Sequence, residues 1–290
     1  MKINPQMFRG YDLRGLVDVD LNNDIVEHIG RAFGAMMKRR GISELVVGRD
    51  SRASGPEYSA ALIKGLNYSG VDVIDIDMNL IGTFYWAQYF LKRRAGVFVS
   101  ASHNPPEYNG FKFANDFSET LVSDDMNELR RMVVEEDYEK SKITGKSIKV
   151  DVREDYFKDL LNRVPIKKNF RVVVDGSAAT AGAIVPEILR RAGCEVVEYN
   201  CKVDSSFPLG VADPTSSKVI GRLSKEVLES KADIGFNYDA DGDRIGIVDE
   251  KGNIIWNDVL VAIFAKDVLS DHPGATIMYN TLCSKVVPDT

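Results

Sequence analysis

The chain has 290 residues, and at roughly 100–200 residues per domain this length predicts two domains and part of a third. Charged residues make up 28% and hydrophobic residues 44% of the sequence, which is typical of a soluble globular protein and excludes a disordered, collagen-like or membrane-spanning chain. The formal net charge of -6 provides no overall positive field for nucleic acid or an anionic membrane surface. We therefore expect a small molecule or a cation as the partner, with no nucleic acid and no membrane.

The cysteines and the apolar runs indicate the compartment. Cys194, Cys201 and Cys283 are odd in number and form no Cys-x-x-Cys pair, so neither a disulfide framework nor a zinc knuckle is expected. The longest apolar run, near residues 81–91, is far shorter than the about 20 residues that span a bilayer. Residues 1–14 contain no apolar stretch of signal-peptide length. We expect a protein of the reduced cytoplasm.

A β-α-β unit is predicted in the first part of the chain. An apolar strand at residues 44–47 is followed by a polar, glycine-bearing turn at 48–55. Pro56 stands where the first turn of a helix tolerates proline, and the helical pattern ends near Gly70. The alternating residues 71–76 predict the second strand.

The same order of elements recurs later in the chain. Strand, turn, helix and strand are predicted at residues 171–174, 175–177, 184–192 and 194–199. A third copy is expected to begin with a strand at residues 275–279 and then to stop. The sequence therefore predicts a chain of tandem similar α/β domains with an incomplete third domain.

A charge-dense stretch at residues 135–149 separates the first two units. We interpret it as a solvated helix end followed by a linker. The predicted domains are residues 1–150, 151–256 and 257–290.

The first candidate for chemistry is the Ser-Ala-Ser-His-Asn-Pro-Pro segment that ends the strand-like run at residues 97–99. Two consecutive prolines forbid a regular strand ladder here, so we expect Ser102 on an exposed, shaped loop that presents its hydroxyl. The alternative is that Ser102 or Asn104 only caps a turn. A serine hydrolase is less favoured, because no G-x-S-x-G motif is present and the only histidines are His28, His103 and His272.

The second candidate is the acidic segment at residues 239–244. Asp239, Asp241 and Asp243 occupy alternate positions, so their carboxylates repel one another unless a cation or protonation relieves them. Oxygen ligands at this density suit Mg²⁺ or Ca²⁺. Strand-like residues flank the cluster on both sides, which favours this interpretation over a merely solvated acidic loop.

Two other sites share this spacing. An EF-hand loop would place a glycine where Arg244 stands, and the flanks would be helical, so it is disfavoured. A haloacid-dehalogenase-type phosphatase would use Asp239 as its nucleophile, but its pattern continues with Thr or Val where this chain has Asp243. That phosphatase remains the alternative.

Basic residues near these segments could bind an anionic substrate. Arg14, Lys112 and Arg244 are the best local sources of positive charge. A single basic residue of this kind is more often solvated or salt-bridged than bound to a ligand. Only the three together indicate a site for an anionic substrate.

Three motifs, in order, resemble the α-D-phosphohexomutase family, in its phosphomannomutase/phosphoglucomutase branch. They are F-R-G-Y-D-L-R-G at residues 8–15, S-A-S-H-N-P at 100–105 followed by Y-N-G-F-K at 108–112, and D-A-D-G-D-R at 239–244. The resemblance implies mixed sheets sandwiched by helices, with a phosphoserine loop in the first domain and a metal-binding loop in the second. The family normally has four domains, and the sugar-reading loop and last domain are not present in this sequence.

The resemblance also implies the chemistry. Ser102 would carry a phosphoryl group, and Mg²⁺ would be held by Asp239, Asp241, Asp243 and a phosphate oxygen on Ser102. The group would pass to a hexose phosphate to form a hexose bisphosphate, and Ser102 would then take back the other phosphoryl group. The net result would move phosphate between C1 and C6 of mannose or glucose phosphate.

Further roles follow from the same resemblance. His103 and Lys112 are the candidates for handling the hydroxyl proton, Lys112 only if its pKa is depressed. Arg14 and Arg244 would position and neutralise the transferred group, and Tyr11 would line the same wall. We expect a truncated chain of weak activity, with a magnesium-dependent aspartyl-type phosphatase or a non-catalytic phosphosugar-binding fragment as the alternatives.

Overall fold

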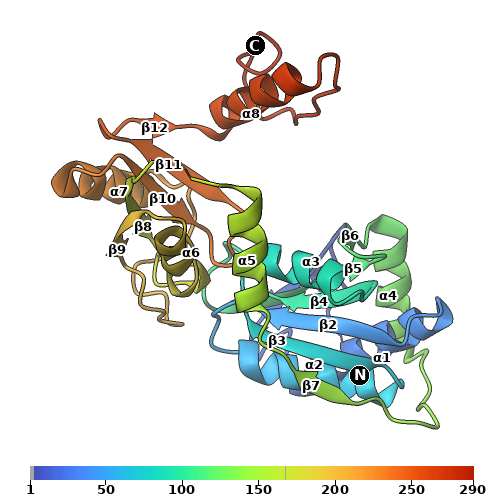
Figure 1. The fold of residues 1–290 in the computed structure, drawn as a ribbon. Coiled ribbons are helices and arrows are strands. Elements are labelled where there is room, and N and C mark those ends of the chain that lie inside the picture. The colour runs from blue at the N-terminus through green and yellow to red at the C-terminus, as the bar shows by residue number, and fades with distance from the viewer. Residues whose placement is uncertain (1–2, 167) are drawn as a thin grey trace.

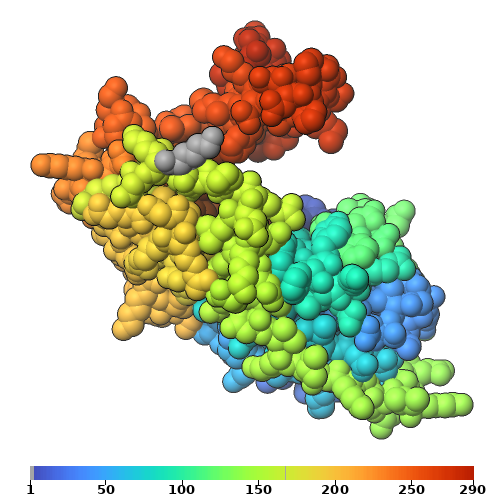
Figure 2. Space-filling model, viewed as in Figure 1, coloured from blue at the N-terminus to red at the C-terminus, as the bar shows by residue number. Residues whose placement is uncertain are grey.

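The computed structural model describes residues 3–166 and 168–290. Met1 and Lys2, the first residues of the N-terminal segment in which no signal peptide is predicted, lie outside this range. The described residues form two sheets, each covered by helices, and a C-terminal helical segment that projects from the second unit (Figure 1, Figure 2). This arrangement confirms the prediction of tandem α/β units.

The first sheet is mixed. Its strands β4, β2, β3 and β7 run parallel, while β5 is antiparallel to both β4 and β1. In spatial order the strands are β1 (Leu13–Leu16), β5 (Tyr108–Asn115), β4 (Ala95–Val99), β2 (Glu44–Arg49), β3 (Asp72–Met78) and β7 (Ser147–Lys149), and β6 (Glu119–Thr120) pairs with β5.

Helices cover both faces of this sheet because its central strands are apolar on both sides. Leu45 and Val47 of β2 face one core with the helices α1 (Asn23–Arg39), α2 (Gly55–Tyr68) and α4 (Ser123–Glu135). Val46 points the other way, into a core with α3 (Ile81–Phe90), as the two-residue period of a strand requires. A short 3-10 helix, η1 (Pro5–Met7), precedes β1.

The second sheet repeats this plan. Its strand order is β12 (Ile254–Ile255), β11 (Ile245–Asp249), β10 (Ile234–Tyr238), β8 (Arg171–Asp175) and β9 (Glu195–Tyr199). One face packs on α5 (Arg153–Arg163) and α6 (Val185–Arg191), which follows the 3-10 helix η2 (Thr180–Ala183), and the other packs on α7 (Ser217–Ser230). The helix α5 contacts both α3 and α6, so it joins the two units (Figure 1).

Both predicted β-α-β units are confirmed. The strands β2 and β3 are parallel and are connected through α2, and the strands β8 and β9 are parallel and are connected through α6. The predicted linker is wrong in part, because β7 within it extends the first sheet next to β3. The predicted domain limits at residues 150 and 256 stay predictions.

The predicted strand at residues 275–279 is wrong. These residues are irregular, and they pair with no strand in the part of the chain that the structure describes. A short apolar run becomes a strand only where a neighbouring strand completes its hydrogen bonds. Here no strand does so, and Met278 is 90% exposed. The segment follows α8 (Asn257–Asp271), whose buried residues are only Ala262 and Ala265. Across residues 3–166 and 168–290, no helix combines the length and apolar character that a membrane crossing requires.

Candidate active site

Residues 100–108, here called the serine loop, run from the end of β4 to Tyr108, the first residue of β5. Ser102 has a φ of 52°, a left-handed conformation that is uncommon outside glycine. Its backbone N–H donates to the Ser100 hydroxyl at 2.8 Å. The sequence predicted an exposed Ser102, and this is wrong: the residue is only 1% exposed, because segments of both units cover it.

Residues 239–244, here called the aspartate loop, connect β10 to β11 and meet the serine loop. The Ser102 hydroxyl donates to Asp239 Oδ2 at 2.7 Å, and the Ser100 hydroxyl donates to Asp241 Oδ2 at 2.8 Å. Asp239 Oδ1 accepts backbone N–H groups of residues 242, 243 and 244. Two segments more than 130 residues apart therefore form one buried polar site.

Lys112 on β5 forms ion pairs with the aspartate loop. Its Nζ lies 2.7 Å from Oδ2 of Asp241 and 2.7 Å from Oδ2 of Asp243. Burial alone would lower the pKa of Lys112, but these two carboxylates outweigh it and raise that pKa above its ordinary value. A proton acceptor would require the opposite shift, so this ion pairing does not meet the condition that the sequence analysis set for Lys112.

His103 lies beside the serine hydroxyl, with its Nδ1 3.3 Å from Ser102 Oγ. Burial, and then the charges of Arg244 and Arg14, lower the pKa of His103 below its ordinary value. This shift favours the neutral imidazole, which is the form that can accept a proton.

The other predicted substrate residues lie in two different settings. Arg14 is buried and donates to Asp12, to the carbonyl of Ala101 and to Asn104 Oδ1, at 2.8, 3.1 and 2.6 Å. The guanidinium of Arg14 thus holds the serine loop through a backbone carbonyl and a side chain. Tyr11 and Arg244 instead line a cavity of about 910 Å³ that also borders the C-terminal segment.

The aspartate loop fits a divalent cation. One carboxylate oxygen from each of Asp239, Asp241 and Asp243 can be chosen so that all lie within 4.8 Å of one another. Asp241 Oδ1 is buried and has no hydrogen-bond partner among the residues that the structure describes. Burial and the charges of Asp241 and Asp243 raise the pKa of Asp239 above its ordinary value. These oxygen donors suit Mg²⁺.

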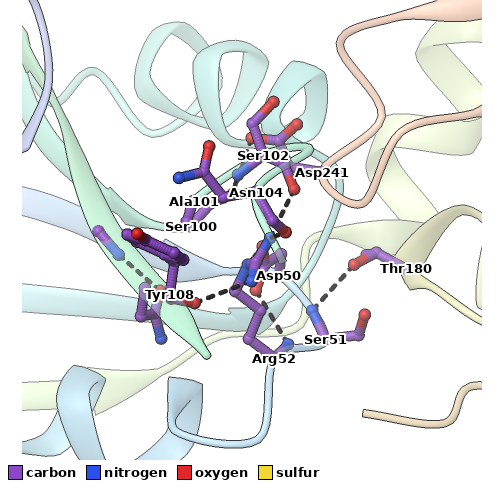
Figure 3. A network of polar contacts seen from close by, with 12 residues as sticks. Asp50, Ser51, Arg52, Ser100, Ala101, Ser102, Asn104, Tyr108, Thr180 and Asp241 are labelled. Atoms are coloured by element: carbon purple, nitrogen blue, oxygen red, sulfur yellow. Dashed lines mark hydrogen bonds and ion pairs between the residues drawn. The ribbon is translucent and has the colours of Figure 1, made fainter. Parts of the chain in front are cut away.

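Three residues that the sequence analysis did not select complete the site (Figure 3). Ser100 bonds the aspartate loop, while Asp50 and Arg52 lie completely buried beneath the serine loop. Burial raises the pKa of Asp50 to about 6. The available signal was the run G-R-D-S-R at residues 48–52, where charged residues directly follow an apolar strand.

Comparisons with known proteins agree with this geometry. The model of phosphoglucomutase/phosphomannomutase α/β/α domain I matches residues 5–140, and that of domain II matches residues 154–252.

Relatives and a solved structure extend the match to nearly the whole chain. Phosphomannomutase/phosphoglucomutase of Pseudomonas aeruginosa is 38% identical over 96% of this chain and 60% of that protein, and phosphoglucomutase of Neisseria gonorrhoeae is 32% identical over 98% and 62%. A crystal structure of a family protein from Burkholderia thailandensis superposes with a TM-score of 0.94 at 32% identity, over 99% of this chain and 65% of that one. The chain thus spans about 60% of the length of these relatives. It belongs to the phosphoglucomutase/phosphomannomutase family.

Proposed function

We propose that this chain is a phosphosugar mutase that moves phosphate between C1 and C6 of a hexose, either mannose or glucose phosphate. One observation carries the proposal: the Ser102 hydroxyl donates to Asp239 at 2.7 Å inside a cluster of three aspartates. The names of the relatives from Pseudomonas and Neisseria support hexose phosphates as the substrates.

Each unit has its own part in this proposal. Residues 1–150 provide the serine loop, residues 151–256 provide the aspartate loop, and residues 257–290 begin a third domain. Asp239, Asp241 and Asp243 would hold Mg²⁺ together with a phosphate oxygen on Ser102. When bound, the cation would offset the charge that three carboxylates and a phosphoryl group bring to one site.

The reaction breaks and forms one phosphorus–oxygen bond in each half. The phosphoryl group leaves Ser102 Oγ for a free hydroxyl of the hexose phosphate, and the hydroxyl proton passes to a base. His103 suits this step better than Lys112, because its surroundings lower the pKa of His103, whereas two carboxylates raise the pKa of Lys112. Ser102 Oγ takes up a proton as the phosphoryl group leaves it. The resulting hexose bisphosphate reverses its orientation, Ser102 Oγ gives up this proton and takes the other phosphoryl group, and the sugar oxygen that is released receives a proton from the base.

Substrate binding is assigned to the residues around the cavity and the serine loop. Arg244 and Tyr11, which line that cavity, would contact the sugar phosphate. Arg14, which bonds the serine loop, would add positive charge next to the transferred phosphoryl group. We also propose a cytoplasmic location, which the free thiols of all three cysteines support.

The phosphatase alternative is not favoured by the family match. The contacts of Asp239 also oppose it, because Oδ1 accepts three backbone N–H groups and Oδ2 accepts the Ser102 hydroxyl. A nucleophilic carboxylate would need one oxygen free to attack phosphorus. A non-catalytic phosphosugar-binding fragment would leave Ser102 without phosphate.

Intact-mass analysis tests the proposal. The wild-type chain is incubated with glucose 1,6-bisphosphate and MgCl₂, and we expect a gain of one phosphoryl group that S102A does not take up. The variant S118A, which removes an exposed hydroxyl of the same unit, should behave as wild type. Unchanged mass of the wild-type chain would contradict the mutase, and phosphate release that persists in S102A would support the phosphatase.

A further inference from the structure

Arg52 is among the largest fully buried side chains of the described residues, with 1% exposure. Its guanidinium donates four hydrogen bonds, and all four acceptors are backbone carbonyls of the serine loop (Figure 3). Nη1 bonds the carbonyls of Pro105 and Tyr108, both at 2.8 Å, and Nη2 bonds those of Ser102 and Asn104, at 2.7 and 2.6 Å. Only a planar fork with several fixed donors can bind four separate carbonyls in this way.

Asp50 compensates the buried positive charge of Arg52. Its carboxylate is fully buried, with Oδ2 3.3 Å from Arg52 Nε and with Oδ1 accepting the Arg52 backbone N–H at 3.0 Å. The Asp50 backbone N–H donates to the carbonyl of Val99, the last residue of β4. The pair is therefore tied to the strand from which the serine loop starts.

The loop needs such support because of its backbone conformation. Ser102 has a φ of 52°, and a non-glycine residue in this region costs of order 1–3 kcal/mol unless its surroundings hold it there. Arg52 binds the carbonyl of Ser102 itself and that of Asn104 on its far side. These bonds fix the peptide planes that aim Ser102 Oγ at Asp239.

The same short segment also contacts the second unit. The backbone N–H of Ser51 donates to Thr180 Oγ1 at 2.9 Å, and the guanidinium carbon of Arg52 lies 5.3 Å from the centroid of the Phe207 ring. Residues 50–52 thus touch both the serine loop and the unit that contributes the aspartate loop. A change in Arg52 would alter the distance between the serine hydroxyl and the aspartates.

We propose that Arg52 is a positioning residue for phosphoryl transfer at Ser102, acting through four carbonyls of the serine loop and never on the sugar itself. The inference rests on the mutase function proposed above. A misplacement of about 1 Å of a reacting group can cost roughly 100-fold in rate. Replacing Arg52 should lower the rate of phosphoryl transfer and leave substrate binding nearly unchanged, since Arg52 does not line the cavity assigned to the substrate.

The test measures the rate at which Ser102 gains a phosphoryl group from glucose 1,6-bisphosphate, by intact mass, over a range of bisphosphate concentrations. We expect R52M and R52K to lower the maximal rate by about 10- to 100-fold, with the half-saturating concentration changed less than about twofold. R52K matters most, because lysine keeps the charge and the buried stem but cannot serve four carbonyls. Rates are expressed per folded protein, measured by circular dichroism.

Two further variants keep the result interpretable. Asp50→Asn leaves Arg52 in place without its charge partner, and it should lower the maximal rate by a smaller factor. Arg153→Met is the control, because Arg153, which is half-buried, also donates to a backbone carbonyl, that of Met78, away from the serine loop. It should keep the wild-type rate.

The outcomes separate the two proposals. A wild-type chain that takes up no phosphoryl group would overturn the mutase function and this inference with it. If the wild-type chain is phosphorylated and R52K reacts at the same rate, or if the loss lies only in the half-saturating concentration, the role of Arg52 is overturned and the mutase function stands.

Discussion

Replacing Lys112 with methionine tests how the aspartate loop is neutralised. The Lys112 ammonium lies 2.7 Å from Asp241 and 2.7 Å from Asp243, and the side chain of Asp241 is completely buried. Removing one partner of a buried ion pair costs about 3–5 kcal/mol, because the remaining charge is left uncompensated. The side chain of Asp243 is 38% exposed and screened by water, so we take the lower end, about 3 kcal/mol.

This loss should appear as a lower melting temperature. For a protein of this size, about 1 kcal/mol corresponds to roughly 2–4 °C, so Lys112→Met should melt about 6–12 °C below wild type in EDTA. Mg²⁺ at about 100 times its Kd adds about 2.7 kcal/mol of stability, which would recover nearly the whole loss. Wild type should gain less from Mg²⁺, because the cation and Lys112 compete for the same carboxylate oxygens.

Thermal unfolding followed by circular dichroism, in EDTA and in MgCl₂, measures both effects. The control is Lys149→Met, because the Lys149 side chain is 74% exposed and its Nζ lies 3.5 Å from Asp77. Such surface pairs contribute about 0–1 kcal/mol. Two results would refute the claim that Lys112 neutralises the aspartate loop. One is a melting temperature of Lys112→Met equal to that of wild type in EDTA, and the other is an equal gain in melting temperature for both proteins on adding Mg²⁺.

Three other predictions use contacts described above. Ser100→Ala removes the 2.8 Å bond to Asp241 and should cost about 1–3 kcal/mol, measured by urea unfolding, and should slow phosphate uptake by the serine loop. Gly110→Ala would place a Cβ 2.3 Å from a carbonyl oxygen of β1, so its melting temperature should fall by several degrees, while Gly10→Ala, with open space around it, should melt as wild type does. Burial raises the pKa of Cys201 to about 11, so only about one thiol in a thousand is ionised at pH 8, and peptide mass spectrometry should show iodoacetamide alkylation still accelerating between pH 8 and pH 10. A plateau by pH 9 would contradict that shift.

The sequence was sufficient to predict the elements whose cause is local. The β-α-β units at residues 44–76 and 171–199 follow from apolar runs, turn residues and helix starts that each lie within a few positions. The strand β7 was missed because it is only three residues long and all three are exposed, and it is a strand only through its pairing with β3. The segment 275–279 is the opposite case, since it has apolar residues typical of a strand but no pairing partner in the described chain.

The sequence indicated residues that the structure brings together at the site, but it did not indicate the residues that support them. Serine and aspartate motifs carry a recognisable pattern, so Ser102 and Asp239 were selected before their contact was known. Arg52 and Asp50 look like ordinary surface charges in the sequence, and only the fold shows that both are buried. Arg14 was selected from its motif, but its bonds to the serine loop could not be predicted, because they depend on residues almost 90 positions away.

The separation of Ser102 and Asp239 along the chain has a consequence for biosynthesis. They are 137 positions apart, and a ribosome adding 5–20 residues per second needs roughly 7 to 27 seconds to cover that interval. During this time the nascent first unit presents a strained serine whose hydroxyl has not yet met its aspartate. The contact between Ser102 and Asp239 therefore forms late, when the second sheet docks, and not when the first unit folds.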